Sequence, residues 1–219
     1  IERAKDDTVA IRIGVNSGSL ESDILETYGS PTPEALVEST VRSISLFEEL
    51  GYHNIKLSLK SAHVLETIAA YRLISERVDY PLHVGVTEAG TVLRGSVKSA
   101  VGIGILLQEG IGDTIRVSLS GDPIHEPLVA HTILSALEIE RRGVDVIACP
   151  TCGRTSLDIP HIAEEVEKRL QHITVPLTVA VMGCEVNGPG EAKEADIGIC
   201  GGKKSGLLIK KGEIIRKVD

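Results

Sequence analysis

The sequence has 219 residues, of which 42% are hydrophobic and 25% are charged, and its net charge is −8. This is enough chain for one large domain or two small ones with a real core, and the composition excludes disordered and collagen-like classes. The acidic charge disfavours a broad nucleic-acid-binding surface, and an aromatic content of 2% without tryptophan excludes base-stacking platforms. No apolar run approaches the roughly 18–20 residues that a membrane-spanning helix needs.

Five short runs rich in β-branched residues are the predicted strands, at 10–16, 54–60, 81–87, 113–120 and 144–148. Segments of helical periodicity separate them. The first long helix is expected to begin with Thr32 as its N-cap and Pro33 in its first turn, and to end at Gly51. The second runs from Ser61 to about 78, the third from about 95 to 109, and the fourth from after Pro123 to near 143.

Strands that alternate with helices at this spacing predict an α/β fold with a parallel sheet. The number of units resembles half of a TIM (β/α)8 barrel, and a doubly wound sheet fits less well because no Gly-x-Gly-x-x-Gly follows the first strand. We expect residues 1–143 to form this substrate-binding half barrel. The composition changes at about 144, so residues 144–219 are expected to form a small α/β domain. Its predicted elements are a helix at 160–172, strands at 177–182 and 195–200, and a hairpin at 206–217.

Four of the predicted strands have one apolar and one polar face, since side chains alternate along a strand. We call the second the polar face; it carries Arg12, Gly14, Asn16, Lys56, Ser58, Lys60, His83, Gly85, Thr87, Arg116, Ser118 and Ser120. Helices should cover the apolar face, so the polar face is expected to line the barrel axis, where uncompensated charge is costly. Cations concentrated there in an acidic protein indicate a small polyanion such as a phosphate or diphosphate.

The alternative is that carboxylates pair with these cations or that water solvates them. Barrel enzymes keep their chemistry at the C-terminal ends of the strands, where Asn16, Lys60, Glu88 and Ser118 occur. Glu88 is the acid near this rim, and the sequence leaves open whether it is a general acid or an ion-pair partner.

The four cysteines, at 149, 152, 184 and 200, all lie in the last third of the chain. Cys149 and Cys152 form a Cys-x-x-Cys pair after one predicted strand, and Cys184 follows another, so together they could hold a metal or a cluster. From spacing alone an iron–sulfur cluster, a structural zinc and a thiol redox pair all remain open. A fourth ligand could be Cys200, Glu185, Glu191 or an external group, and the flexible loop 187–190 could bring Glu191 towards Cys184.

Several strings together resemble one family, 4-hydroxy-3-methylbut-2-enyl diphosphate synthase of the methylerythritol phosphate route to isoprenoids. The two most specific are ACPTCGR at 148–154 and MGCEVNGPGEA at 182–192; the others are IRIGVNSGSL at 11–20, GVTEAG at 85–90, EGIGDTIRVSL at 109–119 and ADIGICGGK at 195–203. The family has a TIM barrel followed by a small iron–sulfur domain. This chain resembles the second half of that barrel and the whole cluster domain.

The resemblance implies a [4Fe-4S] cluster held by Cys149, Cys152, Cys184 and Glu191. It implies that 2-C-methyl-D-erythritol 2,4-cyclodiphosphate is reductively opened and loses a hydroxyl as water. The positions that match the family's substrate-binding residues are Arg12, Asn16, Lys60, Arg116, Ser118 and Asn187, the last beside the cluster. Glu88 matches a rim glutamate that assists proton transfer, and Glu191 is expected to act in catalysis as the replaceable ligand. Glu185 and Cys200 depart from the family pattern and are rival ligands.

The resemblance also implies ferredoxin or flavodoxin as the electron donor and a homodimer. The alternatives are a zinc-dependent barrel lyase or hydrolase of a phosphorylated substrate, and a non-enzymatic electron-transfer module. The chain opens with Ile1 and its only methionine is Met182, so we expect a part of a longer protein that is inactive alone. We find no secretory signal and expect a bacterial cytoplasmic location, with the plastid stroma as the alternative.

Overall fold

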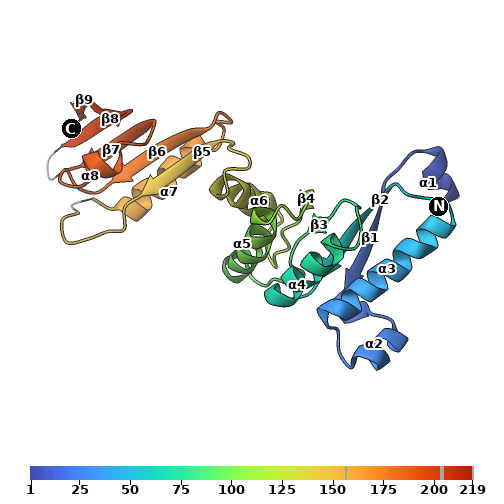
Figure 1. The fold of residues 1–219 in the computed structure, drawn as a ribbon. Coiled ribbons are helices and arrows are strands. Elements are labelled where there is room, and N and C mark those ends of the chain that lie inside the picture. The colour runs from blue at the N-terminus through green and yellow to red at the C-terminus, as the bar shows by residue number, and fades with distance from the viewer. Residues whose placement is uncertain (156, 203–204, 219) are drawn as a thin grey trace. The chain divides into compact units, whose positions relative to one another are not determined.

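The computed structural model describes residues 1–155, 157–202 and 205–218 (Figure 1). The chain divides into two compact units, Ile1–Ile139 and Glu140–Asp219, each with its own sheet structure and core. No helix within the described ranges is both long and apolar enough to span a lipid bilayer.

The first unit is built on four parallel strands: β1 Ile11–Asn16, β2 Ile55–Lys60, β3 His83–Val84 and β4 Thr114–Ile115. β1 pairs with β2 along its whole length, β2 meets β3 at a parallel bridge between Leu57 and Leu82, and β3 pairs with β4. In the part of this unit that the structure describes, the strands do not close into a barrel. This is the predicted open half of a (β/α)8 arrangement.

The first unit contains a short 3-10 helix and six α-helices: η1 Ser17–Ser19, α1 Glu2–Asp6, α2 Ser22–Tyr28, α3 Pro33–Glu49, α4 Val64–Ser75, α5 Val92–Gln108 and α6 His125–Ala136. The predicted boundaries of α3 are confirmed. The Thr32 side chain accepts a hydrogen bond from Ala35 N at 3.2 Å, and Gly51 takes a φ of +64° just beyond the helix end. α1 and α2 were not predicted.

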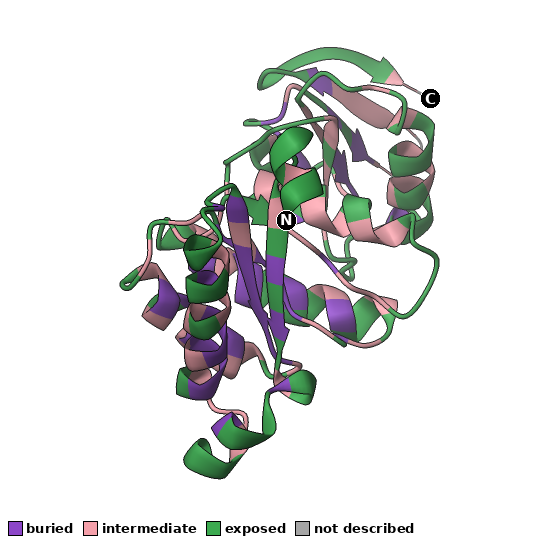
Figure 2. Cartoon of the chain, turned by 90° about the vertical axis from the view of Figure 1, so that its right-hand side faces the viewer, coloured by how far each residue is buried: buried purple, intermediate pink, exposed green. Residues whose placement is uncertain are grey.

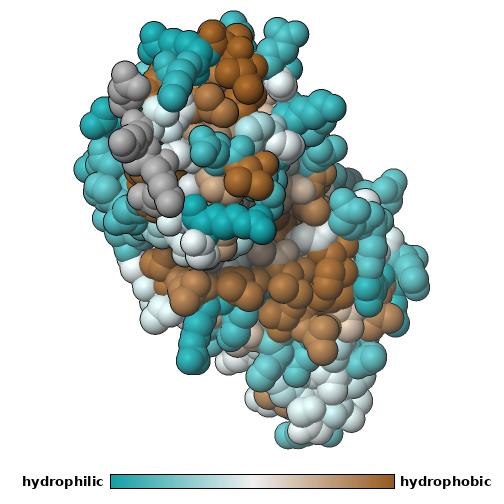
Figure 3. All heavy atoms as spheres, turned by 90° about the vertical axis from the view of Figure 1, so that its left-hand side faces the viewer, coloured by the Kyte–Doolittle hydropathy of each residue, from teal (hydrophilic) through white to brown (hydrophobic). Residues whose placement is uncertain are grey.

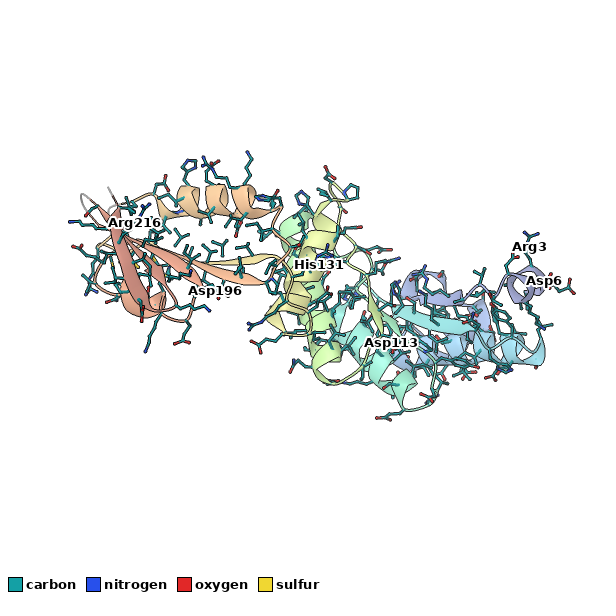
Figure 4. The ribbon with its side chains drawn as sticks, turned by 90° about the horizontal axis from the view of Figure 1, so that it is seen from above. Arg3, Asp6, Asp113, His131, Asp196 and Arg216 are labelled. Carbon is teal, nitrogen blue, oxygen red and sulfur yellow. The ribbon has the colours of Figure 1, made fainter. Side chains whose placement is uncertain are left out.

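The third and fourth strands are shorter than the expected 81–87 and 113–120. Regular pairing of β2 with β3 stops at the Leu57–Leu82 bridge, because the Tyr71 hydroxyl enters the sheet beyond it. Leu59 N donates to this hydroxyl at 3.1 Å, and the hydroxyl donates to His83 O at 2.6 Å. A side chain from α4 thus satisfies the backbone groups that regular pairing of β2 with β3 would have satisfied. The start of the β3–β4 pair is held by Asp113 (Figure 4), whose Oδ2 accepts from Leu82 N at 2.7 Å.

The core of the first unit lies between the strands and the helices. Ile13, Val15, Leu57 and Leu59 are buried on the apolar faces of β1 and β2, as their alternation predicts. The helices contribute buried residues such as Leu36, Ile68, Ile74 and Ile103 to the same cluster. Figure 2 shows the buried residues in purple on the strands and on one side of the helices.

The second unit has one five-stranded sheet with the order β5-β6-β7-β8-β9. The strands are β5 Val144–Ala148, β6 Leu177–Met182, β7 Ile197–Gly201, β8 Gly206–Lys210 and β9 Glu213–Val218, and the helices are α7 Ile159–Leu170 and α8 Gly188–Glu191. The first three strands are parallel and the last two form the predicted hairpin. The expectation that 187–190 is a flexible loop is wrong, because residues 188–191 form α8, with Pro189 in its first turn, where a missing N–H costs nothing.

Candidate functional site

The polar face of the first unit brings cationic side chains from different strands together. The parallel register sets Arg12 beside Lys56 and Asn16 beside Lys60. Arg12 and Asn16 are exposed, whereas Lys60 is only 2% exposed. Ser58 is also buried, and Arg116 and Ser118 follow β4 and are half-buried.

Lys60 is held among other positive charges. Burial first, and then the positive charges of Arg116 and Arg12, lower the pKa of Lys60 to about 7. At a pH near 7, half of the protein molecules would therefore carry Lys60 as an uncharged amine, because the protein provides too little negative charge beside it. An anion bound beside Lys60 would therefore restore its proton and be attracted by it.

The same positive charges act on His83, which lies on the neighbouring strand β3. Burial lowers its pKa to about 4, and the further causes are the positive charges of Lys60, Arg12, Lys56 and Arg116. Its Nδ1 is hydrogen-bonded to Thr114 Oγ1 at 2.7 Å. His83 is thus neutral at pH 7, and the cations around it number four: Arg12, Lys56, Lys60 and Arg116.

These four cations lack carboxylate partners among the described residues. Ion pairs elsewhere in the described chain include Arg3–Asp7, Arg42 with Asp23 and Glu38, Arg72–Glu109 and Arg169–Glu165. Arg116 Nε is buried and has no hydrogen-bond partner within the described ranges, and Ser58 Oγ is buried near the Tyr71 hydroxyl. An orphaned donor beside unpaired cations is the chemistry of an anion site.

Glu88 lies in the exposed loop after β3, with a left-handed φ of +50° that is uncommon for a residue with a Cβ. In the described part of the chain it makes no ion pair with the cations of the polar face. Its position at the rim fits either of the roles that the sequence left open.

Tyr71 is the residue at this site that sequence reasoning missed. Its hydroxyl is buried between β2 and β3, bonded to the backbone of Leu59 and His83, and burial raises its pKa to about 12. Helical periodicity marks Tyr71 as a core position, and it carries no signal that its hydroxyl would serve the sheet.

In the second unit, backbone amides point at two of the cysteine thiols. Cys149 follows β5, and Gly183 N donates to its Sγ at 3.1 Å. Cys184 follows the neighbouring strand β6, and the amides of Asn187, Val186 and Gly188 lower the pKa of its thiol. Amides aimed at sulfur stabilise thiolates, which are the form that binds metal.

Cys200 occupies the core beneath these groups. It is completely buried, and a Cβ on Gly188 would lie 2.9 Å from its Sγ. Burial raises the pKa of Cys200 to about 11, and the negative charges of Cys184, Glu191 and Cys149 add to this rise. Cys149, Cys184 and Glu191 therefore lie close enough for their charges to act on the buried Cys200 thiol, which stays protonated at neutral pH.

The described residues nevertheless contain no group of three His, Cys, Asp or Glu side chains arranged to hold a metal ion. Cys152 and Glu191 are exposed, Cys152 in the turn after Cys149 and Glu191 at the end of α8. The donor types fit an iron–sulfur cluster, because Cys149 and Cys184 already receive amide hydrogen bonds of the kind that cluster thiolates receive. Glu185 is exposed as well.

Together the two units define an α/β protein with a cationic half barrel and a cysteine-bearing domain. Profiles of known families match both parts: the GcpE TIM-barrel domain at residues 1–131 and the GcpE protein C-terminal domain at residues 145–219. The chain belongs to the GcpE family. The predicted fold class, a partial TIM barrel followed by a small domain, is thereby confirmed.

Curated relatives align with this chain over nearly its whole length. Proteins from Geobacter sulfurreducens and Caldanaerobacter subterraneus are 58% and 60% identical over 218 residues, and one from Clostridium perfringens is 56% identical over 218. All three are named 4-hydroxy-3-methylbut-2-en-1-yl diphosphate synthase (flavodoxin). Each alignment includes the whole of this chain but only 61–62% of the relative, so the chain spans about three-fifths of the relatives' length.

Proposed function

We propose that this chain is the diphosphate-binding and cluster-bearing part of a 4-hydroxy-3-methylbut-2-en-1-yl diphosphate synthase. The reaction is reductive opening of 2-C-methyl-D-erythritol 2,4-cyclodiphosphate to 4-hydroxy-3-methylbut-2-enyl diphosphate. Two electrons are consumed and a hydroxyl leaves as water. The observation that carries the proposal is the group of four unpaired cations with the orphaned donor of Arg116, since this is a site for a polyanion.

In this proposal the polar face holds the diphosphate. Arg12, Lys60 and Arg116 supply charge, and Asn16 and Ser118 supply hydrogen bonds at the strand ends. Asn187 lies in the second unit, beside Cys184, and would contact the substrate from there. Glu88, in its left-handed loop at the rim, would deliver the proton that the leaving hydroxyl needs.

Cys149, Cys152, Cys184 and Glu191 would hold a [4Fe-4S] cluster. Such a cluster supplies electrons and a Lewis-acidic iron when bound. The oxygen donor of Glu191 is a weaker and more exchangeable ligand for iron than a thiolate, so its exposed position suits a ligand that gives way to substrate.

The proposal is tested by anaerobic reconstitution of the complete natural protein with iron and sulfide, followed by EPR and turnover with a reductant. Exchanging Cys149, Cys152 or Cys184 for serine should abolish the EPR signal. Glu191→Gln should keep much of the signal and lose most turnover. One zinc without acid-labile sulfide would instead indicate a zinc-dependent barrel enzyme. A cluster with no binding of diphosphate would indicate an electron-transfer module.

The partners belong to the same proposal. The relatives' names support flavodoxin rather than ferredoxin as the electron donor, and their bacterial sources support the bacterial cytoplasm rather than the plastid stroma. We propose a homodimer as well. Its support is a stripe of apolar residues at i, i+4 and i+8 on α5, where Leu93, Val97 and Val101 are 78%, 58% and 46% exposed. Figure 3 shows apolar side chains gathered on one face of the molecule.

A further inference from the structure

The Thr155 hydroxyl is a buried polar atom that finds no hydrogen-bond partner in the described part of the second unit. Thr155 closes the turn after the Cys-x-x-Cys pair, where its N–H donates to Cys152 O at 3.0 Å. Buried hydroxyls are nearly always hydrogen-bonded, because a desolvated donor without an acceptor costs free energy. Valine has nearly the same shape and would fill the same space without this cost. The presence of a hydroxyl here therefore indicates that it has a hydrogen-bond acceptor.

The neighbours of this hydroxyl are the cysteine ligands proposed above. A Cβ on Gly183 would lie 2.5 Å from Thr155 Oγ1, so the hydroxyl packs directly against the Gly183 backbone. The N–H of this same glycine donates to Cys149 Sγ at 3.1 Å, and Cys184 is the next residue in the chain. Thr155 is therefore near all three cysteines. It packs against Gly183, which donates to Cys149 and precedes Cys184, and its own N–H donates to Cys152 O.

We propose that Thr155 is a positioning residue whose hydroxyl donates a hydrogen bond to a sulfur of the metal centre held by Cys149, Cys152 and Cys184. The inference rests on the proposed function, because it needs a sulfur-rich centre at these cysteines. The centre provides the acceptor that the hydroxyl lacks in the protein chain alone. The hydroxyl then joins the amides that already point at Cys149 and Cys184.

A hydrogen bond donated to a sulfur of the metal centre is expected to shift the reduction potential of that centre in one direction. Reduction adds negative charge to the centre, and a donor directed at its sulfur stabilises that charge. Thr155 therefore raises the reduction potential and helps the centre to accept electrons from its donor protein.

The test compares Thr155→Val, which removes the hydroxyl at nearly constant shape, with Thr155→Ser, which keeps it. Both are made in the complete natural protein, reconstituted with iron and sulfide and titrated with dithionite under EPR. Thr155→Val should shift the midpoint potential to a lower value, and Thr155→Ser should stay near the wild type. Equal potentials for all three proteins would overturn the proposal.

A second measurement separates this role from simple packing. Without metal, Thr155→Val should unfold at the same temperature as the wild type or higher, because it deletes an unpartnered hydroxyl. After reconstitution it should gain less thermal stability than the wild type or Thr155→Ser. If Thr155→Val cannot be loaded, rescue by Thr155→Ser supports the proposal and failure of both variants contradicts it. A wild type that binds no cluster contradicts the proposed function itself.

Discussion

At the scale of single residues, Lys60 is the most informative side chain of the candidate anion site. Its strand position is read directly from the alternation of β2, but its burial and its lack of a carboxylate partner in the described chain are not. A lysine whose pKa is lowered to about 7 couples anion binding to protonation, because the anion prefers the charged form.

We predict that anion affinity falls as the pH rises above about 7. Above its folded-state pKa Lys60 loses its charge, so the affinity for sulfate, whose own charge is constant there, should drop up to about tenfold per pH unit. Isothermal titration calorimetry between about pH 6 and pH 8.5 measures this. Lys60→Gln should bind weakly without the slope, and Lys98→Gln, on exposed α5, should keep it. The same slope in Lys60→Gln would assign the proton to another group.

His83 makes a prediction about stability. Its folded-state pKa of about 4 is below the ordinary value of 6.5, so the unfolded chain binds the proton more readily between these values. The contribution of neutral His83 to the free energy of unfolding is therefore fully present above pH 6.5 and is lost as the pH falls towards 4. For a half-buried group the loss is on the order of 1–3 kcal/mol. Urea unfolding of His83→Gln should show a smaller loss than the wild type.

The matched control for that experiment is His131→Gln. His131, labelled in Figure 4, is exposed on α6, and its replacement removes an imidazole that lies outside the polar face. We expect it to leave the acid loss of stability as it is in the wild type. An acid loss of the same size in His83→Gln would mean that other groups destabilise the fold at low pH.

At the scale of elements, the sheet of the first unit depends on one side chain from a helix. Tyr71 bridges Leu59 N and His83 O, so Tyr71→Phe leaves two buried backbone groups without partners. We expect a loss of about 1–3 kcal/mol in the free energy of unfolding, measured by urea titration. Tyr80→Phe is the control, since the Tyr80 hydroxyl donates to Glu48 in an exposed environment and its loss should cost less than about 1 kcal/mol. Equal losses would contradict the bridging role.

Elements with strong local signals were predicted well. The alternation in β1 and β2, the Thr32 cap and the Gly51 terminator are local features, and each appears where it was expected. β3 and β4 were predicted too long. Beside β3, Tyr71 lies 12 positions away in sequence and donates the hydrogen bond that His83 O accepts in place of a neighbouring strand. Helix α8 was missed because four residues with two glycines and a proline carry no helical periodicity.

The candidate site shows the same limit of sequence reasoning. The polar face of the strands and the spacing of Cys149, Cys152 and Cys184 pointed to two kinds of chemistry. Neither pattern could indicate that the Thr155 hydroxyl lacks a partner or that Cys200 is buried below the other cysteines. Those facts depend on packing between segments far apart in sequence.

At the scale of the whole molecule, the two units divide the proposed chemistry. The first unit carries the unpaired cations and the second carries the cysteines, each on its own core. The proposed reaction requires both groups, so the activity of the complete protein should be sensitive to changes in either unit, and the binding of sulfate at the polar face only to changes in the first. The cysteine variants described above separate these readouts.

The proposed homodimer gives a prediction at this same scale. The stripe formed by Leu93, Val97 and Val101 would pair with the same stripe of a second copy, since a two-fold interface uses one patch twice. Val97→Glu would place two carboxylates in that apolar contact, so the complete protein should fall to the monomer mass in light scattering after size exclusion. Val175→Glu is the control, because Val175 is 61% exposed in the second unit and outside the stripe. A Val97→Glu protein that keeps the dimer mass would place the interface on another surface.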